Sequence, residues 1–198
     1  MQLDLWDRPS GLPEGFEYRP DLLSPAEEAE LLGYFTQLEF KPFEFHGYLG
    51  NRRVVSFGLH YDFAGGGMTR TQEIPDFLLP LRDRAAAFAG LAAAELEHVL
   101  VAQYPPGAGI GWHRDRPAFG DVIGVSLASA CRFRLRRKSG AGWERAALRV
   151  EPRSVYLLRG PARWEWQHSI PPGEQLRYSV TFRSIKAKLD LAKEERHP

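Results

Sequence analysis

The second half of the chain alternates short apolar runs with turn residues, and this pattern restricts the fold more than any other feature. Seven runs with strand character follow one another from residue 98 onward, separated by Gly, Pro or Ser. They are HVLVAQY, DVIGVSLAS, CRFRLRR, WERAALRV, SVYLLR, RWEWQHSI and LRYSVTFRSI. Strands at spacings of about 8 to 12 residues are typical of a sandwich or a barrel. We therefore expect a mostly β core.

The first half predicts helices that flank this core. Residues 24–38, SPAEEAELLGYFTQL, combine a Ser N-cap, a Pro at the first helical position and a Glu three residues after the cap, which predicts an amphipathic helix. The Ala- and Leu-rich residues 75–96 predict a second helix despite Pro80, with an apolar face that packs on a sheet. Residues 43–57 alternate aromatic and polar side chains around LGN, which predicts a β-hairpin. The expected class is α+β.

Length and composition predict one domain. With 198 residues, of which 43% are hydrophobic, the chain buries a full core without disulfides or a partner subunit. We expect a monomer with helices and hairpin in residues 1–97, the β core in residues 98–185 and a charged tail in residues 186–198.

The location of the protein is expected to be the cytoplasm. Cys131 is the only cysteine, which excludes an internal disulfide and favours a reducing compartment. No apolar run approaches the ~20 residues of a membrane span. The start of the chain lacks the basic and apolar segments of a signal peptide.

Charge is divided unevenly along the chain. Residues 1–100 carry a net charge of −8 and residues 101–198 a net charge of +9. Within the basic half, alternation in CRFRLRR places Arg132, Arg134 and Arg136 on one face of a strand. This face would either follow the phosphates of a nucleic acid or be an ordinary solvated surface, and both interpretations remain open.

The stretch GWHRDRP contains two candidate metal ligands. In extended geometry His113 and Asp115 point to the same side, and His168 is the best placed third ligand. Two histidines and a carboxylate bind iron(II) on one face and leave positions open for substrates. The alternative is a charged turn with a structural histidine. By parity, Trp164 and Trp166 would lie on the side of His168 as walls of the site.

The late strand LRYSVTFRS predicts an unusual cationic face. Alternation places Arg177, Ser179, Thr181 and Arg183 on one side, opposite an apolar side. Two arginines that face a core need anions, and a guanidinium pairs best with a carboxylate. A dicarboxylate ligand would satisfy both.

Together, HRD, the later His168 and RYSVTFR resemble the AlkB family of Fe(II) and 2-oxoglutarate-dependent dioxygenases. The order and spacing match over residues 98–183, and VAQYPPGAGIGWHRD resembles the strand and loop that enter the site of that family. A weaker similarity extends through RRVVSFGLHYDF, where the family carries its substrate-facing hairpin. The resemblance implies a double-stranded β-helix, or jelly-roll, as the catalytic core.

The resemblance also implies roles for individual residues. His113, Asp115 and His168 would bind the iron. Four residues would bind 2-oxoglutarate: Tyr104, Arg177, Ser179 and Arg183. In the family pattern Arg177 would hold the distal carboxylate, Arg183 would lie near the other end, and Tyr104 would donate a hydrogen bond.

The reaction that this resemblance implies is an oxidative dealkylation. 2-Oxoglutarate and O2 are cosubstrates, succinate is formed, and a hydroxylated N-methyl group is lost as formaldehyde. We expect an enzyme of DNA repair that acts on alkylated DNA or RNA, with no protein partner and no membrane. Two alternatives are the same chemistry on a tRNA base or protein side chain, and a barrel that binds a metal or carboxylate without turnover.

Recognition of a base would depend on aromatic side chains in the first half of the chain. A flipped base needs flat partners, and the candidates are His60, Tyr61 and Phe63, or Phe43 and Phe45. The alternative is that these rings fill the core of the hairpin.

The chain departs from the family pattern at two places. Ala102 replaces an Asn in the Asn-X-Tyr pattern, so one cosubstrate hydrogen bond is absent or comes from elsewhere. Arg116 and Pro117 follow the HRD where founding members carry acidic residues, which leaves the choice of base open.

Overall fold

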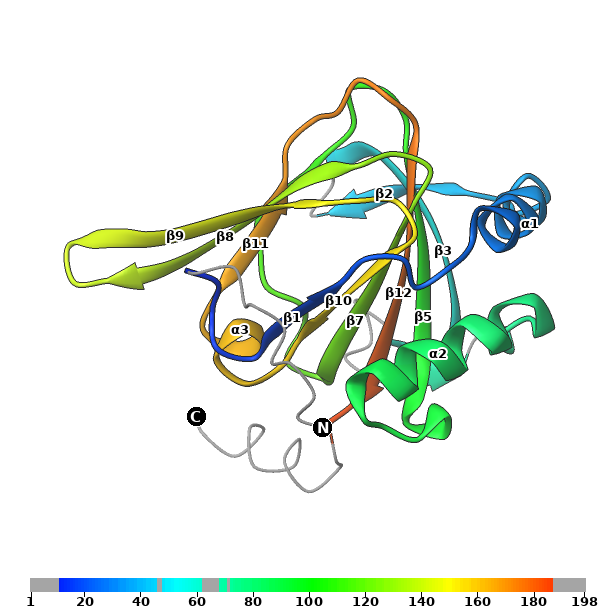
Figure 1. Cartoon of the computed structure of the whole chain (residues 1–198), viewed down its shortest axis with the longest axis horizontal. Helices are drawn as coiled ribbons and strands as arrows, with labels where there is room; N and C mark the ends of the chain where they lie inside the picture. Colours follow the sequence, from blue (N-terminus) through cyan, green and yellow to red (C-terminus); the bar gives the residue numbers. More distant parts are fainter. Residues whose placement is uncertain (1–10, 46–47, 62–67, 71, 187–198) are drawn as a thin grey trace, which may run out of the picture.

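The computed structural model describes residues 11–45, 48–61, 68–70 and 72–186, with the side chains of residues 44–45, 48–50, 60–61 and 68–70 left out. Within these residues two antiparallel sheets face each other (Figure 1). The predicted tail at residues 186–198 falls almost wholly outside this part of the chain.

The larger sheet has eight strands, in the order β1-β10-β7-β12-β5-β3-β2 with β4 paired to β3. Their bounds are β1 Phe16–Arg19, β2 Lys41–Phe45, β3 Tyr48–Tyr61, β4 Met68–Arg70, β5 Leu96–Tyr104, β7 Phe119–Leu127, β10 Ser154–Leu158 and β12 Arg177–Ile185. The smaller sheet has the order β6-β11-β8-β9. Its bounds are β6 Ile110–His113, β8 Cys131–Ser139, β9 Gly142–Val150 and β11 Gln167–Ile170.

From β5 onward the chain passes repeatedly between the two sheets. β5, β7, β10 and β12 belong to the larger sheet, whereas β6, β8, β9 and β11 belong to the smaller one. This alternation is the double-stranded β-helix that the sequence predicts. The expected mostly β fold with flanking helices is confirmed.

Two helices from the first half of the chain cover the outer face of the larger sheet (Figure 1). They are α1 Pro25–Phe35 and α2 Leu79–Ala89, with short 3-10 turns η1 Asp76–Leu78 and η2 Ala93–Glu95. Pro80 lies in the first turn of α2, where its missing N–H has no helical partner to lose, so the predicted helix forms despite it. Leu81 and Ala85 of α2 are buried and belong to the same main core as Val180 and Phe182 of β12.

Two local predictions were wrong in detail. The hairpin forms between β2 and β3, but LGN lies inside β3, because a register shift near Pro42 breaks the alternation on which its turn was placed. The first two residues of RWEWQHSI are helical, because Pro161 lies in the first turn of the short helix α3 Gly160–Trp164. Strand parity therefore fails there: Trp164 is 39% exposed, and Trp166 is buried in the core between the sheets.

In the described part of the chain, no helix has the length and apolar composition needed to cross a membrane.

Candidate functional site

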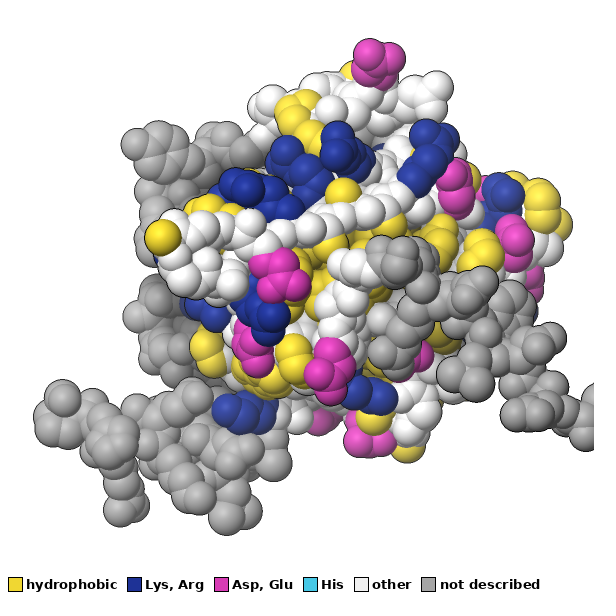
Figure 2. Space-filling view, turned by 60° about the vertical axis from the view of Figure 1, so that its left-hand side comes forward, with side chains coloured by type: hydrophobic (Ala, Val, Ile, Leu, Met, Phe, Trp, Pro, Cys, Tyr) yellow, Lys and Arg dark blue, Asp and Glu magenta, His cyan; other side chains and the backbone are white. Residues whose placement is uncertain are grey.

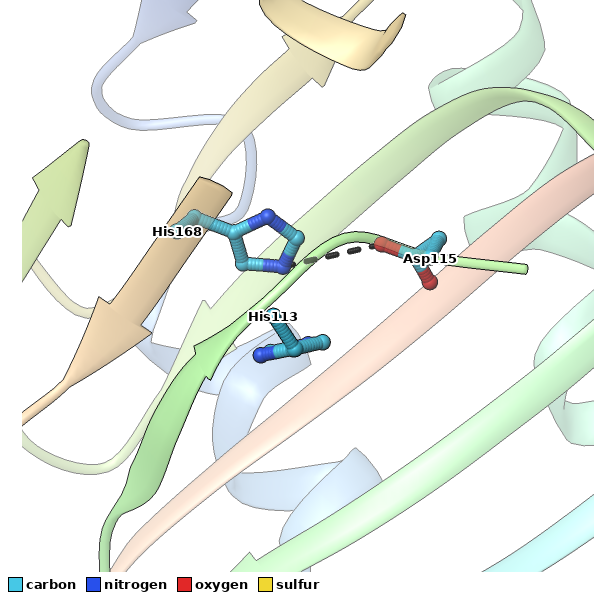
Figure 3. Close-up of side chains that lie close together, drawn as sticks. All are labelled: His113, Asp115 and His168. Atoms are coloured by element: carbon cyan, nitrogen blue, oxygen red, sulfur yellow. Dashed lines mark ion pairs between the residues drawn. The ribbon is translucent and has the colours of Figure 1, made fainter. Parts of the chain in front are cut away.

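The two candidate histidines are brought together by strand pairing in the smaller sheet. β11 pairs with β6 so that His168 lies directly opposite His113, and the two rings have their centroids 4.2 Å apart. β6 ends at His113, and the following loop brings Asp115 to the same side. The possible ligand atoms of all three residues lie within 4.8 Å of one another, with His168 Nε2 3.5 Å from Asp115 Oδ2 (Figure 3). Arg114 turns away and donates to the Trp164 carbonyl at 2.8 Å.

One hydrogen bond decides which nitrogen of His113 is available. Nδ1 lies 2.9 Å from the Gly111 carbonyl oxygen. Since a carbonyl oxygen only accepts, Nδ1 carries the proton, and the lone pair of a neutral ring is on Nε2. A ligand histidine commonly fixes its tautomer through such a contact.

Both histidines are held neutral. Burial, followed by the neighbouring His113 ring, lowers the pKa of His168 to about 3, although Asp115 opposes the shift. Burial also lowers the pKa of His113. At neutral pH both rings therefore offer lone pairs to a metal without first losing a proton.

Asp115 keeps its negative charge in this buried place. Burial alone would raise the pKa of its carboxyl, but Arg183 and then the two histidines hold that pKa below the ordinary value. Arg183 places Nε and Nη2 each 2.7 Å from Oδ1. This leaves Oδ2 on the side of His168. The site combines two neutral imidazoles with one carboxylate, which is the donor set of nonhaem Fe(II) oxygenases.

Arg163 holds the loop that carries Asp115. This residue of α3 is 3% exposed and donates to four backbone carbonyl oxygens, those of Asp115, Arg116, Phe119 and Gly120, at 2.6 to 3.2 Å. Arg163 was not identified from the sequence, because every residue has a backbone carbonyl and the sequence does not indicate which of them an arginine will contact.

The predicted cationic face of β12 is confirmed. Tyr178, Val180 and Phe182 enter the main core under the helices. On the opposite side, Arg177 and Ser179 are 3% and 4% exposed. The predicted alternation therefore turns two arginines and a serine toward the space between the sheets.

Arg177 has spare hydrogen-bonding capacity in a buried place. Its Nε donates to Ser126 Oγ at 3.1 Å, and its guanidinium carbon lies 5.1 Å from the centre of the Tyr104 ring. Both Nη atoms are buried with no hydrogen-bond partner among the described residues. Burying such donors without an acceptor is costly, so the arrangement indicates an anionic ligand.

Tyr104 lies across from Arg177 in the β5–β12 ladder. Burial alone would raise the pKa of its phenol, but the charges of Arg52 and Arg177 hold the pKa below its usual value. Arg52 is 7% exposed and also lies 4.1 Å over the Phe43 ring. Arg52 is a second residue that sequence reasoning did not identify.

A cavity of about 330 Å³ adjoins these groups. Its lining includes Tyr104 and Arg177, together with Cys131, Arg132 and Arg149. Its volume lies in the range of small-molecule sites. A cavity lined by several arginines suits a dianion such as 2-oxoglutarate, so the residues present fit this cosubstrate as well as the iron.

The described part of the structure does not place the predicted base-binding side chains at the site. The backbones of His60 and Tyr61 belong to β3, but their side chains lie outside the described part. The side chain of Phe45 and the whole of Phe63 also lie outside it. The half-buried Phe43 packs under Arg52. Their role in base recognition stays a prediction.

Comparison with known proteins gives a family and a fold. The model of the 2OG-Fe(II) oxygenase superfamily matches residues 15–183. The chain is 31% identical to an alkylated DNA repair protein ALKBH8 homolog of Arabidopsis thaliana over the whole of this chain and 63% of that protein. It is 33% identical to a probable RNA/DNA demethylase ALKBH6 of Danio rerio over 56% of this chain and 45% of that one. It therefore spans between about half and two thirds of these relatives.

The solved structure of OsALKBH1 has a similar fold. It superposes with a TM-score of 0.68 over 87% of this chain and 98% of that chain, at 16% identity. Because the superfamily match takes in His113, Asp115, His168 and both arginines of β12, and the relatives are ALKBH proteins, the chain belongs to the 2OG-Fe(II) oxygenase superfamily and to the AlkB family that its motifs resemble.

Proposed function

We propose that the protein is an Fe(II) and 2-oxoglutarate-dependent dioxygenase that removes alkyl groups from nucleic-acid bases by oxidation. The observation that carries the proposal is the combination of two neutral histidines and a carboxylate with a buried arginine that has two unused donors. The names of two relatives, which refer to alkylated DNA repair and to an RNA/DNA demethylase, support nucleic acid as the substrate.

His113, Asp115 and His168 would hold the iron. When bound, iron supplies the oxidising power with which O2 hydroxylates a C–H bond of the substrate while 2-oxoglutarate becomes succinate and CO2. On an N-methyl group, the hydroxylated carbon then leaves as formaldehyde and the nitrogen regains its proton.

Protein residues contribute orientation, charge and the exclusion of water. The two free Nη atoms of Arg177 would donate to one carboxylate of 2-oxoglutarate in a bidentate pair. Tyr104 would donate its hydroxyl proton from the wall of the same cavity. Phe133 stacks on His168 with ring centroids 5.4 Å apart, which excludes water from the rear of that ring. Arg183 keeps Asp115 ionised and fixed in direction.

The departure from the family pattern at Ala102 has a local explanation that can be tested. Ala102 lies opposite Ser179 in the β5–β12 ladder and is 1% exposed, so an amide there has no room without rearrangement. We infer that Ser179 supplies a hydrogen bond to the cosubstrate instead. The contact of Arg183 is with Asp115, so its predicted contact with 2-oxoglutarate remains a proposal.

A turnover screen tests the proposed function. Purified protein with Fe(II) and 2-oxoglutarate is offered N-methylated single-stranded DNA, the matching RNA and an N-methylated peptide, and succinate and formaldehyde are measured. We expect both products with at least one nucleic acid, and neither product with His113→Ala. Formaldehyde with the peptide alone would move the substrate to protein, and iron and 2-oxoglutarate binding without succinate would indicate a binding module.

We further propose that one chain is sufficient for the reaction, because the triad and the cavity are complete within it. Sedimentation analysis alongside the turnover screen tests this. Activity confined to a dimer fraction would contradict it.

A further inference from the structure

The outer face of the smaller sheet is strongly basic. On β8 and β9 the side chains that point away from the core are basic at six positions, and we call these six the basic face: Arg132, Arg134, Arg136, Lys138, Arg145 and Arg149. Figure 2, which brings this end of the molecule forward, shows Lys and Arg side chains gathered in one area. The opposite sides of the same strands carry Phe133, Leu135 and Leu148, which pack in the core.

Pairing between the two strands increases the repulsion on the basic face. Arg132 lies opposite Arg149, and Arg136 lies opposite Arg145. Like charges at directly opposite positions destabilise a sheet. No side chain of β8 or β9 on this face is a carboxylate, and among the described residues Glu151, just beyond β9, pairs with Arg149. An external polyanion would relieve this repulsion.

On the other side of the same hairpin, carboxylates neutralise the charge of a basic side chain. Arg137, which points away from the basic face, pairs with both Glu144 and Glu165. The charges of the basic face are therefore not a general property of this segment.

Aromatic rings are interleaved with these cations. The guanidinium carbon of Arg136 lies 4.4 Å from the centre of Trp112 and 4.2 Å from that of Trp143, so Arg136 is held between two indoles. Arg134 lies on Trp112 as well, and Lys138 lies 5.5 Å from Trp143. Trp143 is 38% exposed, which leaves part of its ring available to a flat partner.

This pattern matches the chemistry of single-stranded nucleic acid. Alternate side chains along a strand lie about 6.8 Å apart, which is comparable to the separation of successive phosphates. Rows of cations that follow phosphates, with exposed aromatic rings on which bases stack, are the means by which proteins bind such strands. Arg132 and Arg149 also line the cavity beside Arg177, so the basic face begins next to the proposed cosubstrate site.

We propose that the basic face binds the backbone of a single-stranded nucleic acid, with Trp143 stacking on an unpaired base. This surface would hold the strand beside the nucleotide that enters the active site. The proposal rests on the proposed action on nucleic acids.

The test measures binding of a fluorescently labelled single-stranded oligonucleotide without alkylated bases. Its length exceeds the usual site size of such surfaces, which is about 4 to 16 nucleotides. The variant is Arg132→Gln with Arg145→Gln, because both side chains are exposed. The control is Arg19→Gln with Arg84→Gln, which removes the same charge from β1 and α2. Affinity for Mn(II) in place of iron confirms that each variant keeps its metal site.

We expect the double variant to weaken binding about five- to twenty-fold at low salt and to reduce the slope of log affinity against log salt by about 1.4, since each single-strand contact contributes about 0.7. Trp143→Ala should weaken binding about tenfold. The control variant should bind like the wild type.

Three results would overturn the proposal. The first is wild-type affinity and salt slope in the double variant. The second is an equal loss in the control variant. The third is a double variant that binds phosphatidylserine vesicles more weakly than the wild type but binds the oligonucleotide equally well. This result would assign the surface to a membrane. Because no turnover enters the measurement, an inactive protein that still binds through the basic face contradicts only the proposed function.

Discussion

Arg177 is the residue whose surroundings say most about the ligand of the site. It is buried, and both Nη atoms have no partner among the described residues. A structural arginine in such a place would be expected to use these donors within the protein. The unused donors therefore indicate a small anion, and this distinguishes ligand binding from a structural role.

Arg177→Met tests this distinction. We expect the affinity for 2-oxoglutarate to fall about 10- to 150-fold, the equivalent of the 1.5 to 3 kcal/mol typical of a hydrogen bond to a charged group. Without 2-oxoglutarate, the free energy of unfolding in urea should be unchanged or higher, because the variant no longer buries an unpaired charge. A clear loss of stability with unchanged affinity would assign Arg177 a structural role.

Arg163 positions the metal loop without facing the metal itself. The variant Arg163→Lys keeps the charge but loses the planar fork that reaches four carbonyls. We expect metal affinity, measured by titration with Mn(II), to fall about tenfold to a hundredfold, as for other residues that orient ligands. Affinity should remain at the wild-type level in Arg114→Lys, because Arg114 donates to the Trp164 carbonyl and not to the metal loop among the described residues. Equal affinities for wild type and Arg163→Lys would contradict the positioning role.

Residues whose partners are other side chains in a short pattern were predictable, and residues whose partners are backbone or distant rings were not. HRD and the alternation in RYSVTFR predicted His113, Asp115 and Arg177 because strand parity is local. His168 was instead chosen as the best placed histidine on a late strand, and the pairing of β11 with β6 brings it to His113. Arg163 and Arg52 act on carbonyls of residues 115–120 and on the rings of Phe43 and Tyr104, which only the fold brings near.

At the scale of elements, α1 shows how a local signal determines a boundary. Ser24 and Glu27 form the predicted capping box, and Glu27 also pairs with Arg84 of α2. The hydrogen bond from Arg84, followed by those from Ser24, lowers the pKa of Glu27 to about 2. The start of α1 and its contact with α2 therefore depend on one carboxylate.

Glu27→Gln should lower the urea midpoint at neutral pH. A carboxyl group with a lowered folded-state pKa stabilises the protein fully above its unfolded-state pKa of 4.5, and this contribution is lost as the pH falls through about 2. The difference between wild type and variant should thus shrink to less than about half between pH 7 and pH 3. It should also shrink in high salt, because the pair is exposed. A difference that is independent of pH would show that the charge of Glu27 plays no part.

Other elements were mispredicted for equally local reasons. The irregularity near Pro42 adds two residues to β3 relative to β2, so counting alternation placed the turn inside β3. In RWEWQHSI the aromatic content favoured a strand, but Pro161 at the start of α3 favoured a helical turn. Proline position outweighed β propensity there.

At the scale of the whole molecule, the site joins the two sheets. The histidines belong to the smaller sheet, whereas Arg177 and Arg183 belong to β12 of the larger one, and Arg183 reaches Asp115 across the space between them. Strand runs alone predicted seven of the eight strands described from residue 98 onward, but not β6 or the short helix α3. They did not predict which strand joins which sheet, since that depends on long-range packing.

Metal and cosubstrate together should stabilise this arrangement. With Mn(II) and 2-oxoglutarate each at a hundred times its dissociation constant, mass action adds about 2.7 kcal/mol for each ligand, or about 5.4 kcal/mol for the two together. Together they raise the melting temperature by about 11 to 22 °C for a chain of this size. Addition of EDTA should reverse the shift, and Arg177→Met should lose the part that depends on 2-oxoglutarate. A melting temperature that does not respond to either ligand would contradict the assigned site.

The most direct test of the central claim counts products on one substrate. Wild-type protein and His168→Ala are incubated with Fe(II), 2-oxoglutarate, O2 and an N-methylated oligonucleotide, and mass spectrometry follows the methyl group while succinate is quantified. We expect one methyl group lost and one formaldehyde formed for each succinate in the wild type, and none in the variant. Succinate formed with no loss of methyl groups from any methylated DNA or RNA would contradict it.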